Sequence, residues 1–277
     1  MSCPVRWMVE RMLRADALDP DPEPLARGGL AHAALRDTLE GLRQRTGSAR
    51  LTARTLALAR ELLARALEAN EDDFPLSVMP ERRPGVRRRL RADLERYLIH
   101  AAERESPLEP RHLELRFGFA EPDGGLPALD LGGGVMLRGR IDRIDVGAGG
   151  EAIVYDYKGR SVPPAAKWIS QGSLQVALYM RAAEDLLGLR AVGGFYQPLS
   201  GGDLRARGVL DADAGLQIDC VGDDSREQAG VRALLDEAAA AAIGAAAQAE
   251  RGELEARPAT CSFRGGCMYP TICQCER

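Results

Sequence analysis

Hydrophobic and polar positions along the chain follow two periods, one helical and one extended. Apolar residues three and four positions apart predict helices, and shorter runs of alternating or mixed character predict strands. The predicted helices cover residues 4–13, 30–42, 51–70, 86–104, 168–187 and 225–252, and the predicted strands cover residues 112–120, 126–130, 139–146, 153–159, 192–197 and 204–210. This order predicts an α/β fold with a central mixed sheet, helices on both of its faces and an N-terminal helical region.

Three parts follow one another along the 277 residues. Residues 1–105 are expected to be mainly helical, residues 106–220 to form the sheet core, and residues 221–277 to form a long helix and a cysteine-rich tail. The length allows one large domain or two small ones, and 45% hydrophobic residues are enough for a buried core. We expect a single domain over residues 1–277.

The strands at 139–146 and 153–159 are separated by the glycine-rich segment 147–150, which predicts a β-hairpin. Alternate side chains of an extended chain share a face, so Asp156 and Lys158 point the same way. Asp142 can face them from the neighbouring strand. The hairpin therefore predicts two carboxylates and one ammonium group at one place.

Carboxylates brought together away from water repel each other, and a hard divalent cation is the usual compensation. Magnesium is the natural candidate for this hairpin. Lys158 would then lie beside the attacking water and offset charge that builds up on a phosphate, which is the chemistry of phosphodiester hydrolysis. Taken alone, however, the Asp-x-Lys pattern favours a solvent-facing hairpin with alternating charges.

A set of ordered motifs changes this interpretation. The segment Gly139-x-x-Asp142-Arg143-x-Asp145, followed by Asp156-Tyr157-Lys158-Gly159, resembles the core of the PD-(D/E)XK nucleases, in the version carried by RecB and AddB nucleases. Further motifs fit the same family in the same order: Gly29-Leu-Ala-His32, Gln175-x-x-x-Tyr179, and a cysteine-rich C-terminus matched by Cys3-Pro4. Together they span nearly the whole chain. The resemblance implies a restriction-endonuclease-like core within one RecB-like nuclease domain.

The resemblance also implies roles for individual residues. The activity would be hydrolysis of DNA dependent on Mg²⁺ or Mn²⁺, as an exonuclease in repair or recombination. Lys158 would position or activate water, and Gln175 and Tyr179, four apart on one helix face, would arrange the DNA strand. Without the resemblance, Gln175, Tyr179 and His32 would be ordinary helix residues. The implied metal ligands are His32, Asp142, Asp156 and the carbonyl of Tyr157.

Four of the six cysteines lie between Cys261 and Cys275, which indicates a metal or cluster site. An all-thiolate site can hold zinc or an iron–sulfur cluster, and the tail lacks the close CxxC pairs of zinc ribbons. In the family it resembles, one N-terminal and three C-terminal cysteines hold a 4Fe-4S cluster. Cys3, Cys261, Cys267 and Cys273 fit that arrangement. Arg264 departs from the commoner spacing, so Cys275 competes with Cys261 for the remaining position.

Arginines are concentrated around the start of the helix predicted at 86–104. They could hold phosphates and line a DNA groove, or form a solvated helix start balanced by acidic neighbours. These residues are Arg82, Arg83, Arg87, Arg88, Arg89 and Arg91. Two other residues have plainer predictions. Glu114 occupies a polar strand position, where a surface location is favoured over a place near the metal, and Cys220 is expected to be a buried thiol.

Composition and missing motifs set the remaining bounds. The net charge of −4 argues against a protein coated with positive charge but allows a local basic groove. Neither a membrane span nor a signal peptide is indicated, so we expect a cytoplasmic protein. No phosphate loop of the Gly-x4-Gly-Lys-Ser/Thr kind is present, so a helicase would be a separate partner.

The family usually has a further helical segment before the first cysteine, and its absence suggests a module detached from a larger helicase–nuclease. Two alternatives to an active nuclease remain. One is a catalytically inactive nuclease fold that acts as a DNA-binding or scaffolding subunit. The other is a zinc-stabilised interaction domain.

Overall fold

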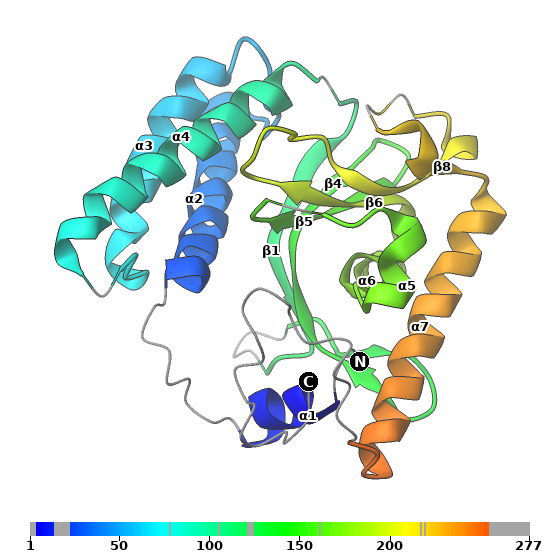
Figure 1. The fold of residues 1–277 in the computed structure, drawn as a ribbon. Helices are drawn as coiled ribbons and strands as arrows, with labels where there is room; N and C mark the ends of the chain where they lie inside the picture. The colour runs from blue at the N-terminus through cyan, green and yellow to red at the C-terminus, as the bar shows by residue number, and fades with distance from the viewer. Residues whose placement is uncertain are drawn as a thin grey trace.

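The computed structural model describes residues 4–13, 23–77, 79–104, 106–120, 125–160, 162–216, 218 and 220–254. Its fold is α/β, with a mixed six-stranded sheet flanked by helices and preceded by helices, as the sequence predicts (Figure 1). The cysteines predicted to hold a cluster, Cys3, Cys261, Cys267 and Cys273, and their competitor Cys275 lie outside the described residues.

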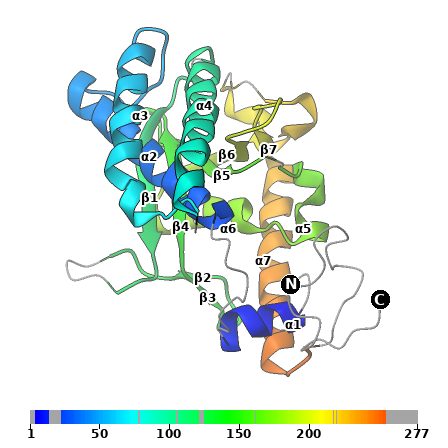
Figure 2. The same cartoon turned by 60° about the vertical axis from the view of Figure 1, so that its left-hand side comes forward.

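The N-terminal part is helical. A short helix continues as a π-helical stretch at Met8–Leu13, and three longer helices pack through leucines and alanines that recur at helical spacing. The helices are α1 (Pro4–Trp7), α2 (Glu23–Thr46), α3 (Leu56–Asn70) and α4 (Arg83–Ala102). Gly28 and Gly29 lie inside α2 and not before it. The Phe74 ring packs where a side chain at position 29 would lie, which explains the glycine there. Figure 2 shows α2, α3 and α4 as one layer.

The central sheet has the order β1-β4-β5-β6-β7-β8. The β1–β4, β4–β5 and β6–β7 pairs are antiparallel, whereas β5–β6 and β7–β8 are parallel. The strands are β1 (Glu109–Phe117), β4 (Gly139–Val146), β5 (Glu151–Lys158), β6 (Arg190–Pro198), β7 (Arg207–Asp211) and β8 (Ser225–Arg226). A separate hairpin pairs β2 (Leu129–Asp130) with β3 (Met136–Leu137). The sequence patterns did not predict β3 or β8.

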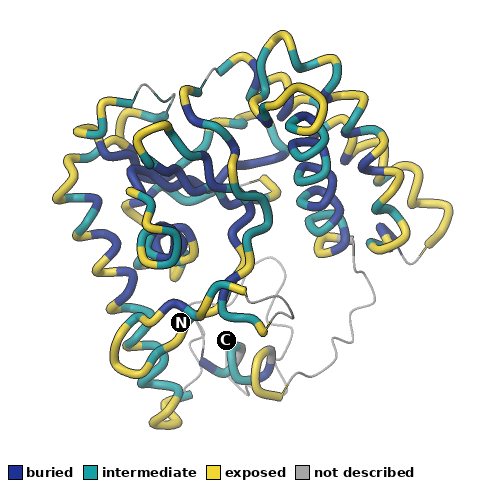
Figure 3. The backbone as a smooth tube through the Cα atoms, turned by 180° about the vertical axis from the view of Figure 1, so that it is seen from behind, coloured by how far each residue is buried: buried dark blue, intermediate teal, exposed yellow. Residues whose placement is uncertain are grey.

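Helices from the C-terminal half cover one face of the sheet. The parallel β5–β6 pair needs a crossover, which contains α5 (Trp168–Gln171) and α6 (Gln175–Leu187). Side chains of α6 and of α7 (Gln228–Glu250) share a buried core with the sheet. Buried positions run through the central strands and along one side of the neighbouring helices (Figure 3). The helical layer of α2–α4 lies on a different side of the sheet from α7 (Figures 1 and 2).

The single helix predicted at 168–187 is wrong. The chain forms α5, breaks at Gly172 with a φ of 66°, and begins α6 at Gln175. A left-handed residue ends a helix because it turns the chain away from the helix axis, and glycine adopts it without a side-chain clash. The break places Gln175 at the first turn of a new helix.

Two smaller points complete the fold. The Cys220 side chain is only partly buried and packs against a cluster containing Ile153, Phe195 and Leu210. Among the described residues, no helix is long and apolar enough to span a bilayer.

Candidate functional site

The β4–β5 hairpin brings Asp142 and Asp156 together. Its ladder pairs Val146 with Ala152 and continues to Arg143 and Tyr155, so the next positions along the two strands are Asp142 and Asp156. There the Tyr157 N–H donates to Asp142 Oδ2 at 2.7 Å. The carboxylate takes the place of a backbone acceptor, which anchors Asp142 at the point where the ladder ends. Asp142 and Asp156 are 6% and 1% exposed, so the solvent-facing hairpin is excluded.

Strand β1 adds a third carboxylate. Leu113 pairs with Arg143 and Leu115 with Ile141, so Glu114 lies level with Asp142. Glu114 has a φ of 51°, and it is the one non-glycine residue with a positive φ in the described part of the chain. Its Oε2 lies 2.8 Å from Arg140 Nε, and its side chain is 9% exposed. The surface location predicted for Glu114 is therefore wrong, because its side chain is largely covered and lies beside that of Asp142.

Helix α2 supplies a histidine. His32 Nδ1 lies 3.2 Å from Asp142 Oδ1 and 3.5 Å from Glu114 Oε1. One potential ligand atom from each of these three side chains lies within 4.8 Å of the other two. The helical layer and the sheet thus meet at this cluster, which needs both parts of the fold to form.

The neighbouring carboxylates raise the pKa of His32. Burial alone lowers the pKa of the imidazole, but hydrogen bonds and charges from Asp142 and Glu114 outweigh burial and raise it to about 10. In the absence of a metal, His32 is therefore protonated at neutral pH and partly neutralises the two carboxylates. A cation that binds here must displace that proton.

Asp156 lies beside the cluster, against Lys158. Burial, followed by the negative charge of Asp142, raises the pKa of Asp156 to about 6. Lys158 Nζ forms an ion pair with Asp156 Oδ2, but this buried oxygen accepts no hydrogen bond with good geometry from any described residue. A buried carboxylate oxygen in this state fits a site that receives a cation.

Lys158 is linked to α6 through side chains. Its Nζ donates to Gln175 Oε1 at 3.1 Å, and Gln175 Nε2 donates to the Tyr179 hydroxyl at 3.1 Å. The Tyr179 ring fits closely over the start of β4. A Cβ atom at Gly139 would lie 2.9 Å from both the Tyr179 and Phe117 rings, which explains the glycine at that position. The structure therefore brings Gln175 and Tyr179 to the lysine side of the acidic cluster.

Tyr157 faces away from the carboxylates. Its ring packs edge-on against His32, with ring centres 5.6 Å apart, and against Tyr97 at 5.9 Å. This contact connects β5 to α2 and α4, so it fixes the histidine relative to the sheet. The role implied for the Tyr157 carbonyl as a metal ligand stays a prediction.

The donor set suits a hard divalent cation. The cluster combines two carboxylates with one imidazole nitrogen, and Asp156 adds a third carboxylate beside it; oxygen-rich sites of this kind favour Mg²⁺ or Mn²⁺. Lys158 and Arg140 supply positive charge at the edge of the group. The residues present therefore fit a metal site.

Comparison with known proteins identifies the family. A family model of the PD-(D/E)XK nuclease superfamily matches residues 1–274. The chain belongs to this superfamily. A comparison with curated protein sequences finds no significant match. Members of the superfamily are usually metal-dependent nucleases, and the PD-(D/E)XK assignment agrees with the mixed sheet and the carboxylate–histidine cluster.

Within this PD-(D/E)XK chain, Glu114 is the site residue that motif matching missed. The signal in the sequence was a single polar residue between Leu113 and Leu115, which is common in strands with one solvated face. No local sequence pattern predicts a positive φ at a glutamate. Only the pairing of β1 with β4 shows that this residue lies level with Asp142.

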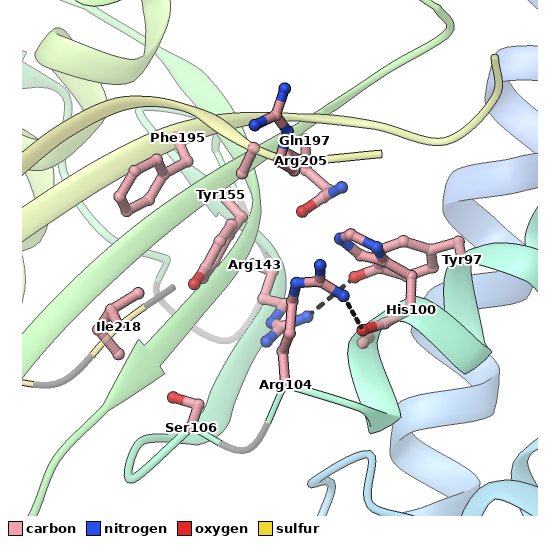
Figure 4. A pocket seen from close by; sticks show the side chains of 12 residues that line it. Tyr97, His100, Arg104, Ser106, Arg143, Tyr155, Phe195, Gln197, Arg205 and Ile218 are labelled. Carbon is pink, nitrogen blue, oxygen red and sulfur yellow. Dashed lines mark hydrogen bonds between the residues drawn. The ribbon is translucent and has the colours of Figure 1, made fainter. Parts of the chain in front are cut away.

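The opposite face of the sheet carries a different group of polar side chains, shown in Figure 4. Arg143 and Tyr155 line a hollow there with Tyr97 and Gln197, and Arg143 Nη1 donates to the Tyr97 hydroxyl at 3.1 Å. Arg143 also pairs with Asp145. None of the predicted catalytic or metal-binding residues lines this hollow.

The arginines near the start of α4 separate into two groups. Arg87 pairs with Glu71 at 2.6 Å, Arg91 pairs with Glu95 at 2.8 Å, and Arg83 donates to the Ser77 carbonyl. These three arginines agree with the interpretation in which the helix start is solvated and its charge is balanced by neighbouring groups. Arg89 instead lines a hollow between α4 and the turn after β6, which agrees with the other interpretation.

Proposed function

We propose that this chain is a divalent-metal-dependent deoxyribonuclease that hydrolyses phosphodiester bonds in DNA. The observation that carries the proposal is the convergence of three carboxylates from neighbouring strands with one histidine and one lysine. An inactive scaffolding subunit would not need to gather three acids, two of them buried, around a histidine and a lysine, since taking these charges out of water costs stability.

Mg²⁺ or Mn²⁺ at this site would supply Lewis-acid polarisation of the scissile phosphate and of the attacking water. The residues that would hold it are His32, Glu114, Asp142, Asp156 and the carbonyl of Tyr157. Release of the His32 proton accompanies binding, because its imidazole nitrogen must be free to coordinate.

Lys158 would orient the attacking water and stabilise negative charge on the phosphate. An ammonium group has three N–H donors. One points to Gln175 Oε1 and the group also lies against Asp156, which leaves donor capacity for a phosphate oxygen or for water. Gln175 and Tyr179 would hold the lysine in this orientation and contact the DNA strand.

The test is digestion of end-labelled single-stranded and duplex DNA with Mg²⁺, Mn²⁺ or EDTA. The wild-type protein is compared with Asp156→Asn and Lys158→Ala. The chain contains two lysines, so Lys167→Ala, which removes the exposed one, is the matched control. We expect metal-dependent cleavage by the wild type and by Lys167→Ala, and a loss of at least about 100-fold in the other two. Equal cleavage by all four proteins, or none by the wild type, would contradict the proposal.

The finer assignment is a RecB/AddB-like exonuclease in repair or recombination, working with a separate helicase subunit. The motifs around His32, Asp142 and Gln175 support this subtype. The position of the label released from 5′- and 3′-labelled DNA tests the exonuclease assignment, since an endonuclease releases internal fragments first. A circular single strand has no ends for an exonuclease, so it is the control substrate for the linear strand.

We also propose a 4Fe-4S cluster held by Cys3, Cys261, Cys267 and Cys273. Helix α1, which follows Cys3, lies at the same end of the molecule as the C-terminal end of α7, which leads to the tail (Figures 1 and 2). Anaerobic purification with iron, sulfide and zinc analysis tests this proposal. Iron with sulfide is expected, and zinc alone would favour a zinc-stabilised domain. Cys261→Ser and Cys275→Ser compared side by side would identify the fourth ligand.

A further inference from the structure

We infer that a single strand of DNA passes through the hollow between α2, α4 and the turn after β6, held there by Arg27, Arg89 and Arg160. This inference rests on the proposed nuclease function and names its substrate as single-stranded DNA. The hollow, called the arginine groove below, is lined by Arg27, Arg89, Asp93, Arg96, Arg160 and residues 200–202.

The charge of the arginine groove comes from three separate segments. Arg27 lies on α2, Arg89 and Arg96 on α4, and Arg160 just after β5. The one acidic residue in the lining, Asp93, pairs with Arg96 at 2.5 Å. No ion pair with a described residue is found for the other three arginines, so their guanidinium groups are available to phosphates.

The wall formed by residues 200–202 is fixed to the end of the catalytic strand. Ser200 N donates to the Gly159 carbonyl at 2.8 Å, its hydroxyl donates to the same oxygen at 2.7 Å, and Leu199 N donates to the Lys158 carbonyl at 2.8 Å. Gly201 lies under the Arg160 side chain, where a Cβ atom would be 3.3 Å from Arg160 Cγ. The turn thus gives the groove a defined side next to the lysine.

Two arginines of the groove lie close along the chain to residues of the proposed metal site. Arg160 follows Lys158 by two residues, and Arg27 precedes His32 by five residues on α2, which is a rise of about 7.5 Å. A strand whose phosphate reaches the acidic cluster would therefore have its neighbouring phosphates within reach of these arginines. Figure 1 shows the turn between β6 and β7 extending toward α4.

The size of the hollow favours a single strand. Its volume of about 460 Å³ is of the order found for pockets that enclose small ligands, about 300–1,000 Å³. A duplex carries a second strand and its phosphates beside the first, so it would need more room than one strand and would rest on the rim. A few linked nucleotides of one strand fit between α4 and the turn.

The test compares Arg27→Gln/Arg89→Gln/Arg160→Gln with a matched triple variant, Arg45→Gln/Arg54→Gln/Arg65→Gln. The control removes the same charge from exposed arginines elsewhere on the helical layer. Binding of a labelled single-stranded oligonucleotide is measured in EDTA at several salt concentrations. We expect the groove variant to bind at least about 10-fold more weakly and its salt slope to fall by about two, because each phosphate contact contributes about 0.7. The control should match the wild type.

Cleavage of a dinucleotide and of a long single strand separates this inference from the proposed function. In the wild type, the long strand should have the lower KM, and in the groove variant that advantage should disappear while kcat changes little. If the wild type cleaves DNA but the groove variant keeps its affinity and its KM for the long strand, the arginine groove is wrong and the nuclease stands. If the groove variant lost affinity for duplex DNA but kept its affinity for single-stranded DNA, the single-strand assignment would be wrong. No cleavage by the wild type would remove the nuclease itself.

Discussion

Strand β4 carries two buried aspartates, Asp142 and Asp145, on opposite faces of the sheet, and their surroundings differ. Asp145 is fully buried and pairs with Arg143, which also donates to the Tyr97 hydroxyl and lies over the Tyr155 ring. Burial alone would lower the pKa of Arg143, but the charge of Asp145 outweighs it and holds that pKa well above its ordinary value. Burial raises the pKa of Asp145 in spite of Arg143, but the guanidinium donates to both oxygens of that carboxylate, so we treat the two as a charged pair in which each satisfies the other.

Asp142 lies among other acids. Glu114 and Asp156 are its neighbours, and His32 partly neutralises the group by holding a proton. One face of the sheet thus has a complete ion pair, whereas on the other face the carboxylates are balanced by Lys158 and Arg140 only while His32 keeps its proton. The Arg143–Asp145 pair stabilises the fold, whereas the group around Asp142 would be stabilised by a bound cation.

The largest expected effect is on activity, through Asp142→Asn. We expect cleavage to fall by about 1,000-fold or more, about 4 kcal/mol of transition-state stabilisation, because the metal site loses a charged ligand. The free energy of unfolding in EDTA should fall only modestly, because an asparagine can still accept from the Tyr157 N–H while His32 loses one of its two anionic partners. Cleavage rates and urea unfolding of the same preparations measure both quantities. Retained activity would place the metal elsewhere.

Asp145→Asn should show the reverse pattern. We expect the free energy of unfolding to fall by about 3 kcal/mol, because Arg143 is left buried without a countercharge, while cleavage per folded molecule stays near wild type. Urea unfolding checks the first statement and cleavage rates check the second. The double variant Arg143→Met/Asp145→Leu removes both charges, so it should recover part of the lost stability. A double variant no more stable than Asp145→Asn would contradict the assignment of a structural pair.

The pH dependence of metal affinity should further distinguish the group around Asp142 from the Arg143–Asp145 pair. Below a pKa of about 10, His32 must release a proton to coordinate a metal, whereas Asp156, with a pKa of about 6, is already ionised above that pH. Between pH 6.5 and 8.5, the Mn²⁺ affinity should therefore rise about 100-fold. His32→Ala should bind more weakly and lose most of this slope. His112→Ala is the control, since burial lowers the pKa of His112 and it lies outside the cluster.

Much of this contrast could be predicted from the sequence. Period-two alternation puts Asp156 and Lys158 on one face, and a short glycine-rich connection places Asp142 opposite them. His32, Gln175 and Tyr179 are different, because their approach to the strands depends on how helices pack against the sheet. Only a resemblance to known proteins could supply those three in advance.

The parts that could not be predicted depend on single backbone conformations and on long-range packing. Gly172 ends α5 through a left-handed φ, and a helical pattern continues across it without interruption. The arginines of α4 look alike in sequence, yet Arg87 faces Glu71 just after α3 while Arg89 faces the turn after β6. Sequence spacing alone does not separate them.

The smallest expected effect concerns the backbone of Glu114. A left-handed conformation costs a residue with a Cβ about 1–2 kcal/mol, whereas glycine adopts it freely. Glu114→Ala and Glu114→Gly both remove the carboxylate, so both should bind Mn²⁺ more weakly. They should differ in stability, with the glycine variant more stable by about 1 kcal/mol, opposite to the usual order in a strand. Urea unfolding of both variants in EDTA measures this difference. An alanine variant of equal or greater stability would show that the strand relaxes at position 114, and hence that the acid is not held in place by backbone strain.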